Sequence, residues 1–314
     1  MIIFIKKIPI IGSSIRFLNR KRIYYKNQTL NFFTVLKRNT IPNMLRELIP
    51  ESLGMIYLKT NFFIFQPNGG GTDKMLTPLH VKSINQTIPL LEKIAGQNNH
   101  EEKQIITSEQ FRKLFFIKEI EANDSKLAAL FTKYGSDKTK HEYHLIYSVI
   151  LSVVKPKCLL EIGMGTNNEK VFSNMSKYGH PGASLRAFRD FLPSTEIYGA
   201  DIDKEILFKE ERINTFYVDQ TNKDTLDKLA KNISNDIDII IDDGLHAPNA
   251  NLQTLMFALE QFNNKKNKWL IIEDIRIDSV VIFKLLTSLI DTSLYKTYIV
   301  RTKRSHVFVC HKYF

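Results

Sequence analysis

Cysteine is scarce in this sequence. Only Cys158 and Cys310 occur among the 314 residues, and each lies within an apolar run that is typical of a strand. A disulfide framework or a cysteine metal site normally needs more cysteines than this, at characteristic spacings. The sequence therefore favours a protein of the reducing cytoplasm.

Long hydrophobic runs are also missing. The opening residues, MIIFIKKIPIIGSSIRF, are apolar but are interrupted by basic residues. A helix that spans a bilayer needs about 20 apolar residues, and a secretory signal has a longer apolar centre followed by a cleavage site of small residues. We expect neither a transmembrane helix nor export, and at most a peripheral membrane contact through this end.

Acidic residues are few in the first 60 positions, where eleven Lys and Arg face only Glu47 and Glu51. The rest of the chain is nearly neutral, although the formal net charge of the whole is +11. A basic arm can bind a membrane surface, a nucleic acid or an acidic glycan, or can simply be solvated surface. Charge alone leaves these alternatives open.

The chain is predicted to contain two parts. Residues 1–95 mix short apolar runs with turn signals such as Pro67-Asn68-Gly69-Gly70-Gly71, which indicates an irregular module. A polar stretch up to Gln104 is typical of a linker. We therefore expect a basic auxiliary region with its linker over residues 1–104 and a second domain over residues 105–314.

Helices are expected at the start of the second domain. One begins after Thr107, because Gln110 stands at the spacing of a capping box. The next covers about 125–134 and ends at Gly135, and a third covers about 140–153.

An alternation of strands and helices follows. Near-continuous apolar runs of this kind are typical of a parallel sheet that is covered on both faces. The expected strands are 157–162, 196–200, 215–218, 237–241 and 269–272. The end of the chain differs, since 295–301 and 305–311 are too close together for a parallel connection and must form an antiparallel hairpin. The fold predicted is an α/β, Rossmann-like methyltransferase sheet that is mostly parallel with an antiparallel C-terminal hairpin.

The ends of the first three strands carry residues that are typical of a nucleotide-binding pocket. Glu161-Ile-Gly163-Met-Gly165 closes the first strand, and its glycines allow a sharp turn close to a ligand. Asp201 ends the second strand, where a carboxylate can hold ribose hydroxyls, and Asp219 with Gln220 ends the third. In dinucleotide-binding folds the acid follows the glycines by about 20 residues, whereas Asp201 lies 36 residues after Gly165. The spacing therefore argues against NAD and favours S-adenosylmethionine; taken singly, Asp219 could instead cap a helix.

The fourth and fifth strands end in four acids and a histidine, namely Asp242, Asp243, His246, Glu273 and Asp274. Like charges so close together need a cation or protonation to coexist. Mg²⁺, which prefers oxygen ligands, would meet this need. The alternative is that some of these acids cap helices and the others are solvated.

The motifs EIGMGTNN, PGASLRAFRDFLP, IYGADID and FYVDQT resemble those of a bacterial family of sugar methyltransferases that includes the metal-dependent macrolide-sugar O-methyltransferases of the mycinamicin type. The resemblance covers about residues 131–314. It implies that Glu161, Gly163, Asp201 and Asp219 surround the cofactor. It further implies that Asp243, Glu273 and Asp274 hold the metal, with Asp242 behind them and His246 as the base.

The same family carries a signature that resembles Tyr134-Gly-Ser-Asp137-Lys138, followed by His141 and Tyr143. The resemblance implies that this segment folds over the cofactor, so Tyr134 and Asp137 are candidate cofactor contacts. Without the family, the segment would be interpreted as the end of a helix and a turn.

The predicted activity is O-methylation of a sugar hydroxyl on a glycan or glycosylated metabolite. A sugar hydroxyl has a very high pKa, so a divalent ion would have to acidify it while a neutral histidine accepts its proton. Two alternatives stay open: a nucleic-acid methyltransferase that uses the basic arm, and a non-catalytic scaffold that binds S-adenosylmethionine. Basic residues interleaved with aromatics, which nucleic-acid binding favours, are absent from the motifs at 163–168 and 242–246. We therefore expect a sugar-containing partner and no specific nucleic acid; whether the chain forms a homo-oligomer stays open.

Overall fold

The computed structural model describes residues 51–95, 105–115, 117, 120–263 and 265–314. The predictions about the basic arm up to residue 50 and about the linker at 96–104 lie outside the described residues. The chain divides into two units, Met1–Gly54 and Met55–Phe314. The second unit contains the predicted domain and begins earlier than residue 105, so the boundary at 104/105 stays a prediction.

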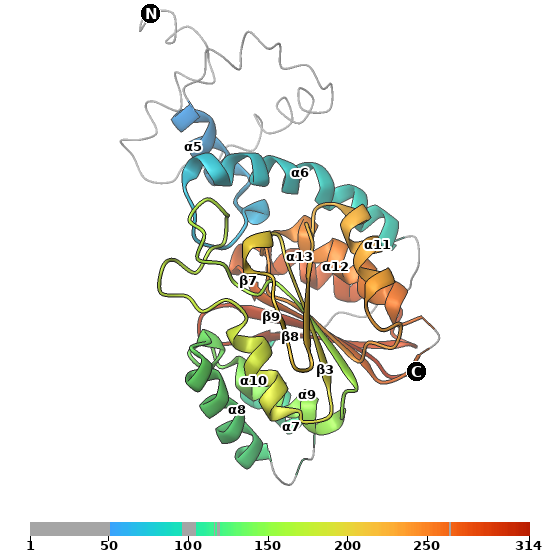
Figure 1. Ribbon diagram of the computed structural model, residues 1–314. Coiled ribbons are helices and arrows are strands. Elements are labelled where there is room, and N and C mark those ends of the chain that lie inside the picture. The colour runs from blue at the N-terminus through green and yellow to red at the C-terminus, as the bar shows by residue number, and fades with distance from the viewer. Residues whose placement is uncertain (1–50, 96–104, 116, 118–119, 264) are drawn as a thin grey trace, which may run out of the picture. The chain divides into compact units, whose positions relative to one another are not determined.

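One nine-stranded sheet forms the centre of the second unit (Figure 1). Its strands are β1 (Ile105–Thr107), β2 (Cys158–Ile162), β3 (Glu196–Asp201), β4 (Lys209–Glu210), β5 (Ile213–Tyr217), β6 (Ile239–Asp242), β7 (Lys268–Ile275), β8 (Tyr295–Arg301) and β9 (His306–Lys312). Across the sheet they follow the order β1-β8-β9-β7-β6-β2-β3-β5-β4. The five central strands β5, β3, β2, β6 and β7 pair in parallel, whereas β9 pairs antiparallel with both β7 and β8. The predicted methyltransferase sheet is confirmed, including the terminal hairpin.

Helices cover both faces of this sheet (Figure 1). The α-helices are α5 (Glu51–Asn61), α6 (Asp73–Ala95), α7 (Ser108–Lys113), α8 (Ile120–Tyr134), α9 (Tyr143–Val153), α10 (Ala183–Phe191), α11 (Lys223–Asn232), α12 (Pro248–Gln261) and α13 (Val280–Leu289). Short 3-10 helices are η1 (Phe63–Phe65), η2 (Asp137–Thr139), η3 (Lys204–Ile206) and η4 (Ile277–Ser279). One face carries α11, α12 and α13 and the other carries α8, α9 and α10, so each face has its own apolar core.

The alternation of side chains along the strands explains why these runs are apolar throughout. Leu160 and Ile240 point into the core beneath α12, whereas the neighbouring Leu159 and Ile239 point into the core beneath α9. All four are fully buried. A strand that is buried on both faces has no position for a polar residue until it ends, so its first polar residues lie at the edge of the sheet.

The predicted helices of the second domain are confirmed. Thr107 caps α7 in a capping box with Gln110, and Gly135 follows α8 with a φ of 81°. Both α8 and α9 begin at residues that differ somewhat from the expectation, at Ile120 and Tyr143. Among the described helices, none is long and apolar enough to cross a membrane.

The expectation of an irregular module is wrong for residues 73–95. They form the 23-residue helix α6, which packs against α12 and α13. The sequence of this helix contains Pro78 and Pro89, and proline disfavours helix interiors because it lacks a backbone donor. Packing against α12 and α13 overrides that local preference.

Candidate active site

A cavity of about 400 Å³ lies at the carboxyl edge of β2, β3, β5 and β6. Its floor and walls come from the strand ends and the loops that follow them, which include Gly163, Gly165, Asp201, Ile202, Val218, Asp219, Gln220, Asp243 and Gly244. Helix α6 contributes Met75, Pro78, Leu79 and Lys82 to the same lining, and the loop after β2 contributes Thr166, Lys170, Val171, Phe172 and Ser173. The carboxyl edge of a doubly wound sheet is where this class of fold binds its ligands.

Gly163 shows why glycine is needed at the end of β2. Its φ is 95°, and a Cβ atom on this residue would lie 2.1 Å from the carbonyl oxygen of Asp243. Any side chain here would push the end of β2 away from the end of β6. Gly165 also has a positive φ, 72°, and both glycines line the cavity.

Asp201 lines the cavity, but its carboxylate is engaged by the protein backbone. Oδ2 accepts a hydrogen bond from Met164 N at 2.8 Å, and Oδ1 accepts one from Asp203 N at 2.9 Å. Burial raises the pKa of Asp201, although these backbone donors oppose the shift. The side chain therefore holds the glycine turn after β2 against the end of β3, in addition to facing the cavity.

The end of β5 forms the next part of the wall. Asp219 accepts hydrogen bonds from the backbone and the hydroxyl of Thr221. Gln220 donates to Asp242 Oδ1 at 2.7 Å and accepts from Leu245 N at 2.8 Å. Gln220 therefore fixes the turn that carries the candidate residues after β6.

Glu161 is fully buried and is not part of the cavity lining. It accepts a hydrogen bond from Ser184 Oγ at 2.6 Å, and its Oε1 lies 3.1 Å from Lys138 Nζ. Burial raises the pKa of Glu161, while Lys138 opposes the shift. Its predicted cofactor role stays a prediction, and the structure places it behind the glycine turn.

Lys138 is the centre of a buried charge cluster. Its side chain is 2% exposed, and its ammonium group lies 2.7 Å from Asp243 Oδ2, 2.6 Å from Glu273 Oε2 and 3.1 Å from Glu161 Oε1. Burial alone would lower the pKa of Lys138, but the three carboxylates raise it well above its usual range. The ammonium group of Lys138 thus balances part of the charge of three acids. We call Lys138, Glu161, Asp243 and Glu273 the lysine cluster.

Sequence reasoning missed this role of Lys138. The residue lies within the signature 134–138, but a lysine in a turn after a helix normally points into solvent. The signal that could have identified it is the excess of acids at the neighbouring strand ends, because buried carboxylates require an opposite charge nearby.

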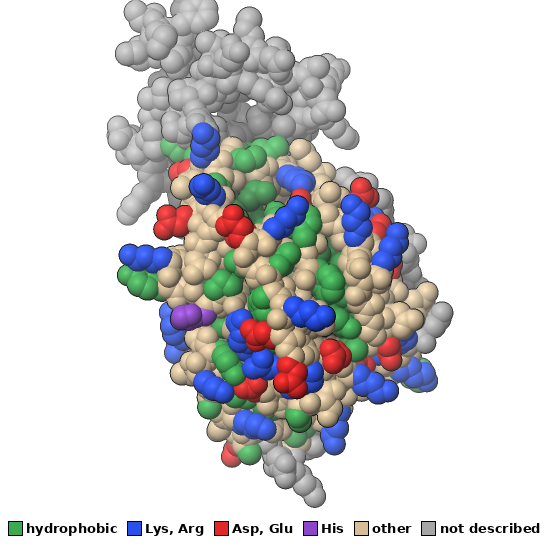
Figure 2. Space-filling view, in the orientation of Figure 1, with side chains coloured by type: hydrophobic (Ala, Val, Ile, Leu, Met, Phe, Trp, Pro, Cys, Tyr) green, Lys and Arg blue, Asp and Glu red, His purple; other side chains and the backbone are tan. Residues whose placement is uncertain are grey.

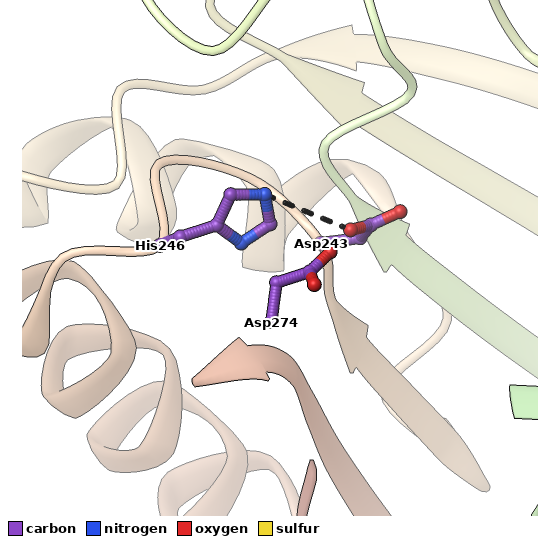
Figure 3. Close-up of side chains that lie close together, drawn as sticks. All are labelled: Asp243, His246 and Asp274. Carbon is purple, nitrogen blue, oxygen red and sulfur yellow. Dashed lines mark ion pairs between the residues drawn. The ribbon is translucent and has the colours of Figure 1, made fainter. Parts of the chain in front are cut away.

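Asp243, His246 and Asp274 form a second group, which shares Asp243 with the lysine cluster (Figure 3). One ligand atom from each residue lies within 4.8 Å of the others. His246 Nε2 lies 3.8 Å from Asp243 Oδ1, the oxygen of Asp243 that does not contact Lys138. The buried Nδ1 of His246 has no hydrogen-bond partner. We call these three residues the acceptor-side group.

Two residues of the acceptor-side group have unusual backbone conformations. The φ angle is 53° at both His246 and Asp274, and non-glycine residues in this region cost about 1–3 kcal/mol each. The pairing of β7 with β9 shifts register between Ile272 and Ile275, and a bulge of this kind redirects side chains. Glu273 and Asp274 lie within this irregularity, and they contact different partners.

The pKa values of Asp274 and Glu273 are shifted in opposite directions. Burial opposes ionisation of Asp274, but the nearby His141 and His246 and the hydroxyl of Tyr143 lower its pKa. Tyr143 donates to Asp274 Oδ1 at 2.8 Å, and His141 Nδ1 lies 3.6 Å from the same oxygen. In contrast, burial and the Asp243 carboxylate raise the pKa of Glu273 well above its usual range.

Glu273 is the predicted metal ligand that the structure places apart from the other two. Its side chain is 1% exposed, and its two oxygens contact Lys138 Nζ and the hydroxyl of Tyr147. Asp243 belongs to both groups, since one of its oxygens contacts Lys138 and the other faces His246.

Tyr134 and Asp137 are not among the residues that line the cavity. The hydroxyl of Tyr134 donates to Asp190 and is also contacted by Lys133 and Arg189. Figure 2 shows the molecule in the orientation of Figure 1. Basic and acidic side chains gather there over the region of α8 and α10. Asp137 is largely exposed and lies 3.5 Å from His141. Their cofactor roles stay predictions.

Comparisons with known proteins agree with the resemblance predicted from the sequence. No protein-family model matches the chain. It is 38% identical over 104 residues to mycinamicin VI 2''-O-methyltransferase of Micromonospora griseorubida, a match that covers 32% of this chain and 23% of that protein. It is 32% identical over 123 residues to 8-demethyl-8-alpha-L-rhamnosyl tetracenomycin-C 2'-O-methyltransferase of Streptomyces olivaceus, which covers 38% of this chain and 30% of that protein. The matches thus span less than a third of either relative.

Among solved structures, the chain is similar to the MycE methyltransferase of the mycinamycin biosynthetic pathway in complex with Mg and SAH. The identity is 28% and the TM-score 0.39, and the match covers 48% of this chain and 36% of that one. A complex of MycE with Mg, SAH and mycinamycin VI matches with 22% identity and a TM-score of 0.46, over 60% of this chain and 54% of that one.

Proposed function

We propose that this protein is an S-adenosylmethionine-dependent O-methyltransferase that acts on a sugar hydroxyl of a glycosylated small molecule. The observation that carries the proposal is the position of Asp243, which lines the cavity and also belongs to the acceptor-side group. A methyl donor in the cavity would therefore lie next to a group that can bind and deprotonate a hydroxyl. The likeness to curated sugar O-methyltransferases supports this assignment.

The cavity suits a nucleoside without phosphate groups better than a dinucleotide. Its acids, Asp201 and Asp219, can accept hydrogen bonds from ribose and adenine groups. No cluster of basic residues that could pair with a pyrophosphate occurs at the glycine turn 163–165, where such a group would lie. S-adenosylmethionine, which has no phosphate, fits this lining.

The acceptor-side group fits a divalent cation. The carboxylates of Asp243 and Asp274 lie close enough together to supply oxygen ligands to one ion, and waters can complete the coordination of Mg²⁺. The ion would polarise the acceptor hydroxyl as a Lewis acid. Glu273, the third predicted ligand, has both oxygens engaged, so its role as a ligand stays a prediction that requires one of these contacts to break.

His246 is proposed as the general base. Its ring is 9% exposed, and its Nε2 faces the acids of the group. A neutral imidazole can accept the proton that leaves the sugar oxygen as the methyl group arrives. Asp243 and Asp274 would stabilise the imidazolium that results, because both carboxylates lie close to it.

A screen of acceptors with labelled S-adenosylmethionine tests the proposal. We expect methyl transfer to glycosylated small molecules and no transfer to RNA or DNA. Transfer to nucleic acid alone would contradict the proposal and favour the basic arm as the substrate-binding element. A cytoplasmic location, peripheral membrane contact and homo-oligomer formation stay predictions.

A further inference from the structure

Asn68 lies in the turn before α6 and contacts two members of the acceptor-side group at once. Its backbone N–H donates to the carbonyl oxygen of His246 at 3.1 Å. Its side-chain Nδ2 donates to the carbonyl oxygen of Asp274, also at 3.1 Å. A single residue, 206 positions before Asp274 in the sequence, therefore joins the loop after β6 to the end of β7.

The two carbonyl groups that Asn68 binds belong to residues with left-handed backbones. Such conformations persist only when the surroundings hold them, because relaxing to an ordinary φ would release strain. A turn of the backbone at either residue would also turn its side chain away from the group. The two hydrogen bonds of Asn68 oppose that change at both positions.

The segment that carries Asn68 is itself anchored to α6 and η4. His80 contacts the carbonyl oxygen of Phe62 at 2.7 Å, and Ser279 Oγ donates to the carbonyl oxygen of Ile64 at 2.6 Å. Both contacts lie just before Pro67, and Phe62 is buried. Asn68 is therefore presented by a fixed segment, which lets it impose a position on its partners.

The following glycines contact the wall of the cofactor cavity. Ser173 N donates to the carbonyl oxygen of Gly70 at 2.7 Å. A Cβ atom on Gly71 would lie 2.6 Å from the ring of Phe172. Phe172 and Ser173 both line the cavity. The segment 67–71 thus lies between the loop over the cavity and the acceptor-side group.

We infer that Asn68 is a positioning residue for the divalent cation of the acceptor-side group. It acts by holding the backbone of Asp274 so that its carboxylate meets that of Asp243 at the cation, and the backbone of His246 so that its ring faces both acids. This inference rests on the proposed function, since it presumes that the group binds a cation. It assigns a role in the active site to the segment 67–71, which the sequence predicts to be a turn of the auxiliary region.

Titration of Mn²⁺ into the full-length protein saturated with S-adenosylhomocysteine tests the inference. Asn68→Ala keeps the backbone N–H but removes the donor to Asp274, and Asn68→Asp replaces the donor by a carboxylate of the same size. We expect the dissociation constant for Mn²⁺ to rise about tenfold in Asn68→Ala, the equivalent of one hydrogen bond, and further in Asn68→Asp. Affinity for S-adenosylhomocysteine should change less than twofold in both.

Asn123→Ala is the matched control, because Asn123 also makes one side-chain hydrogen bond, to Ser152 Oγ at 2.9 Å, between α8 and α9. A purely structural role of Asn68 would lower the melting temperature of both variants alike and leave the Mn²⁺ affinity unchanged. Tight Mn²⁺ binding by the wild type with equal affinity in Asn68→Ala would overturn the inference and leave the proposed function intact. Failure of the wild type to bind Mn²⁺ while it binds the nucleoside would overturn the metal-assisted function and, with it, this inference.

Discussion

The cofactor side and the acceptor side of the site are built in different ways. At the ends of β2, β3 and β5, the cavity is lined by residues that lie at the end of an apolar strand or just beyond it, such as Gly163, Asp201 and Asp219. The acceptor side also begins at strand ends, but Lys138 and Asn68 reach it from elements distant in the sequence. The comparison teaches that the strand-end part of this ligand pocket follows from the strands, whereas the placement of the reacting groups depends on long-range contacts.

The largest effect is expected for His246→Ala, which removes the proposed base from the acceptor side. Loss of a general base lowers the rate by about 10²- to 10⁴-fold, so kcat should fall on this scale. Affinity for S-adenosylhomocysteine, measured by calorimetry, should stay within twofold because the ring is not part of the cavity lining. The exposed His180 offers a control: His180→Ala should keep the wild-type kcat. If His246→Ala retained most of its activity, another group would have to take the proton.

Lys138→Met tests the connection between the two sides, because Lys138 binds acids from β2, β6 and β7. Its removal leaves three carboxylates without their cation, two of which are fully buried, and breaking a buried ion pair costs about 3–5 kcal/mol. We expect the free energy of unfolding in urea to fall by this amount. Lys223→Met removes an exposed ion pair with Asp227 and should cost less than about 1 kcal/mol. Equal losses in the two variants would contradict the role of Lys138 in the cluster.

A smaller effect is expected for Asp201→Ala on the cofactor side. Each hydrogen bond to a charged group contributes about 1.5–3 kcal/mol, and loss of this amount corresponds to a roughly 10- to 100-fold weaker affinity for S-adenosylhomocysteine. Part of this effect comes through the glycine turn, which Asp201 holds by its bond from Met164 N. Asp227→Ala removes an exposed ion pair with Lys223 instead and should leave the affinity unchanged. An unaltered affinity in Asp201→Ala would show that the end of β3 does not contribute to cofactor binding.

The cofactor side and the acceptor side also differ in how far their structure could be predicted from the sequence. The strands were predictable because burial on both faces leaves a continuous apolar run with its first polar residue at the edge. Asp201 was placed correctly at a strand end, yet its two backbone donors depend on how the turn after β2 packs against β3. Helix α6 was not predicted, since its prolines contradict local propensity and its stability comes from packing.

The acceptor side was predictable in its composition but not in its geometry. The acids at the ends of β6 and β7 are visible in the sequence, whereas the register shift at Glu273 and Asp274 and the left-handed backbone of Asp274 are not specified by local sequence. Lys138 resembles any solvent-exposed lysine in a turn, and Asn68 resembles any turn former. Their roles arise only when the fold brings distant segments together.

Chelation of the divalent cation tests the central claim most directly, because it should separate the two sides in one experiment. With EDTA in excess, the full-length protein should lose methyl transfer to its sugar acceptor, and added Mg²⁺ should restore it. Binding of S-adenosylhomocysteine should persist under the same conditions, since its cavity is lined mainly by residues outside the acceptor-side group. Full methyl transfer in EDTA would contradict the account and show that Asp243, His246 and Asp274 do not work through a bound cation.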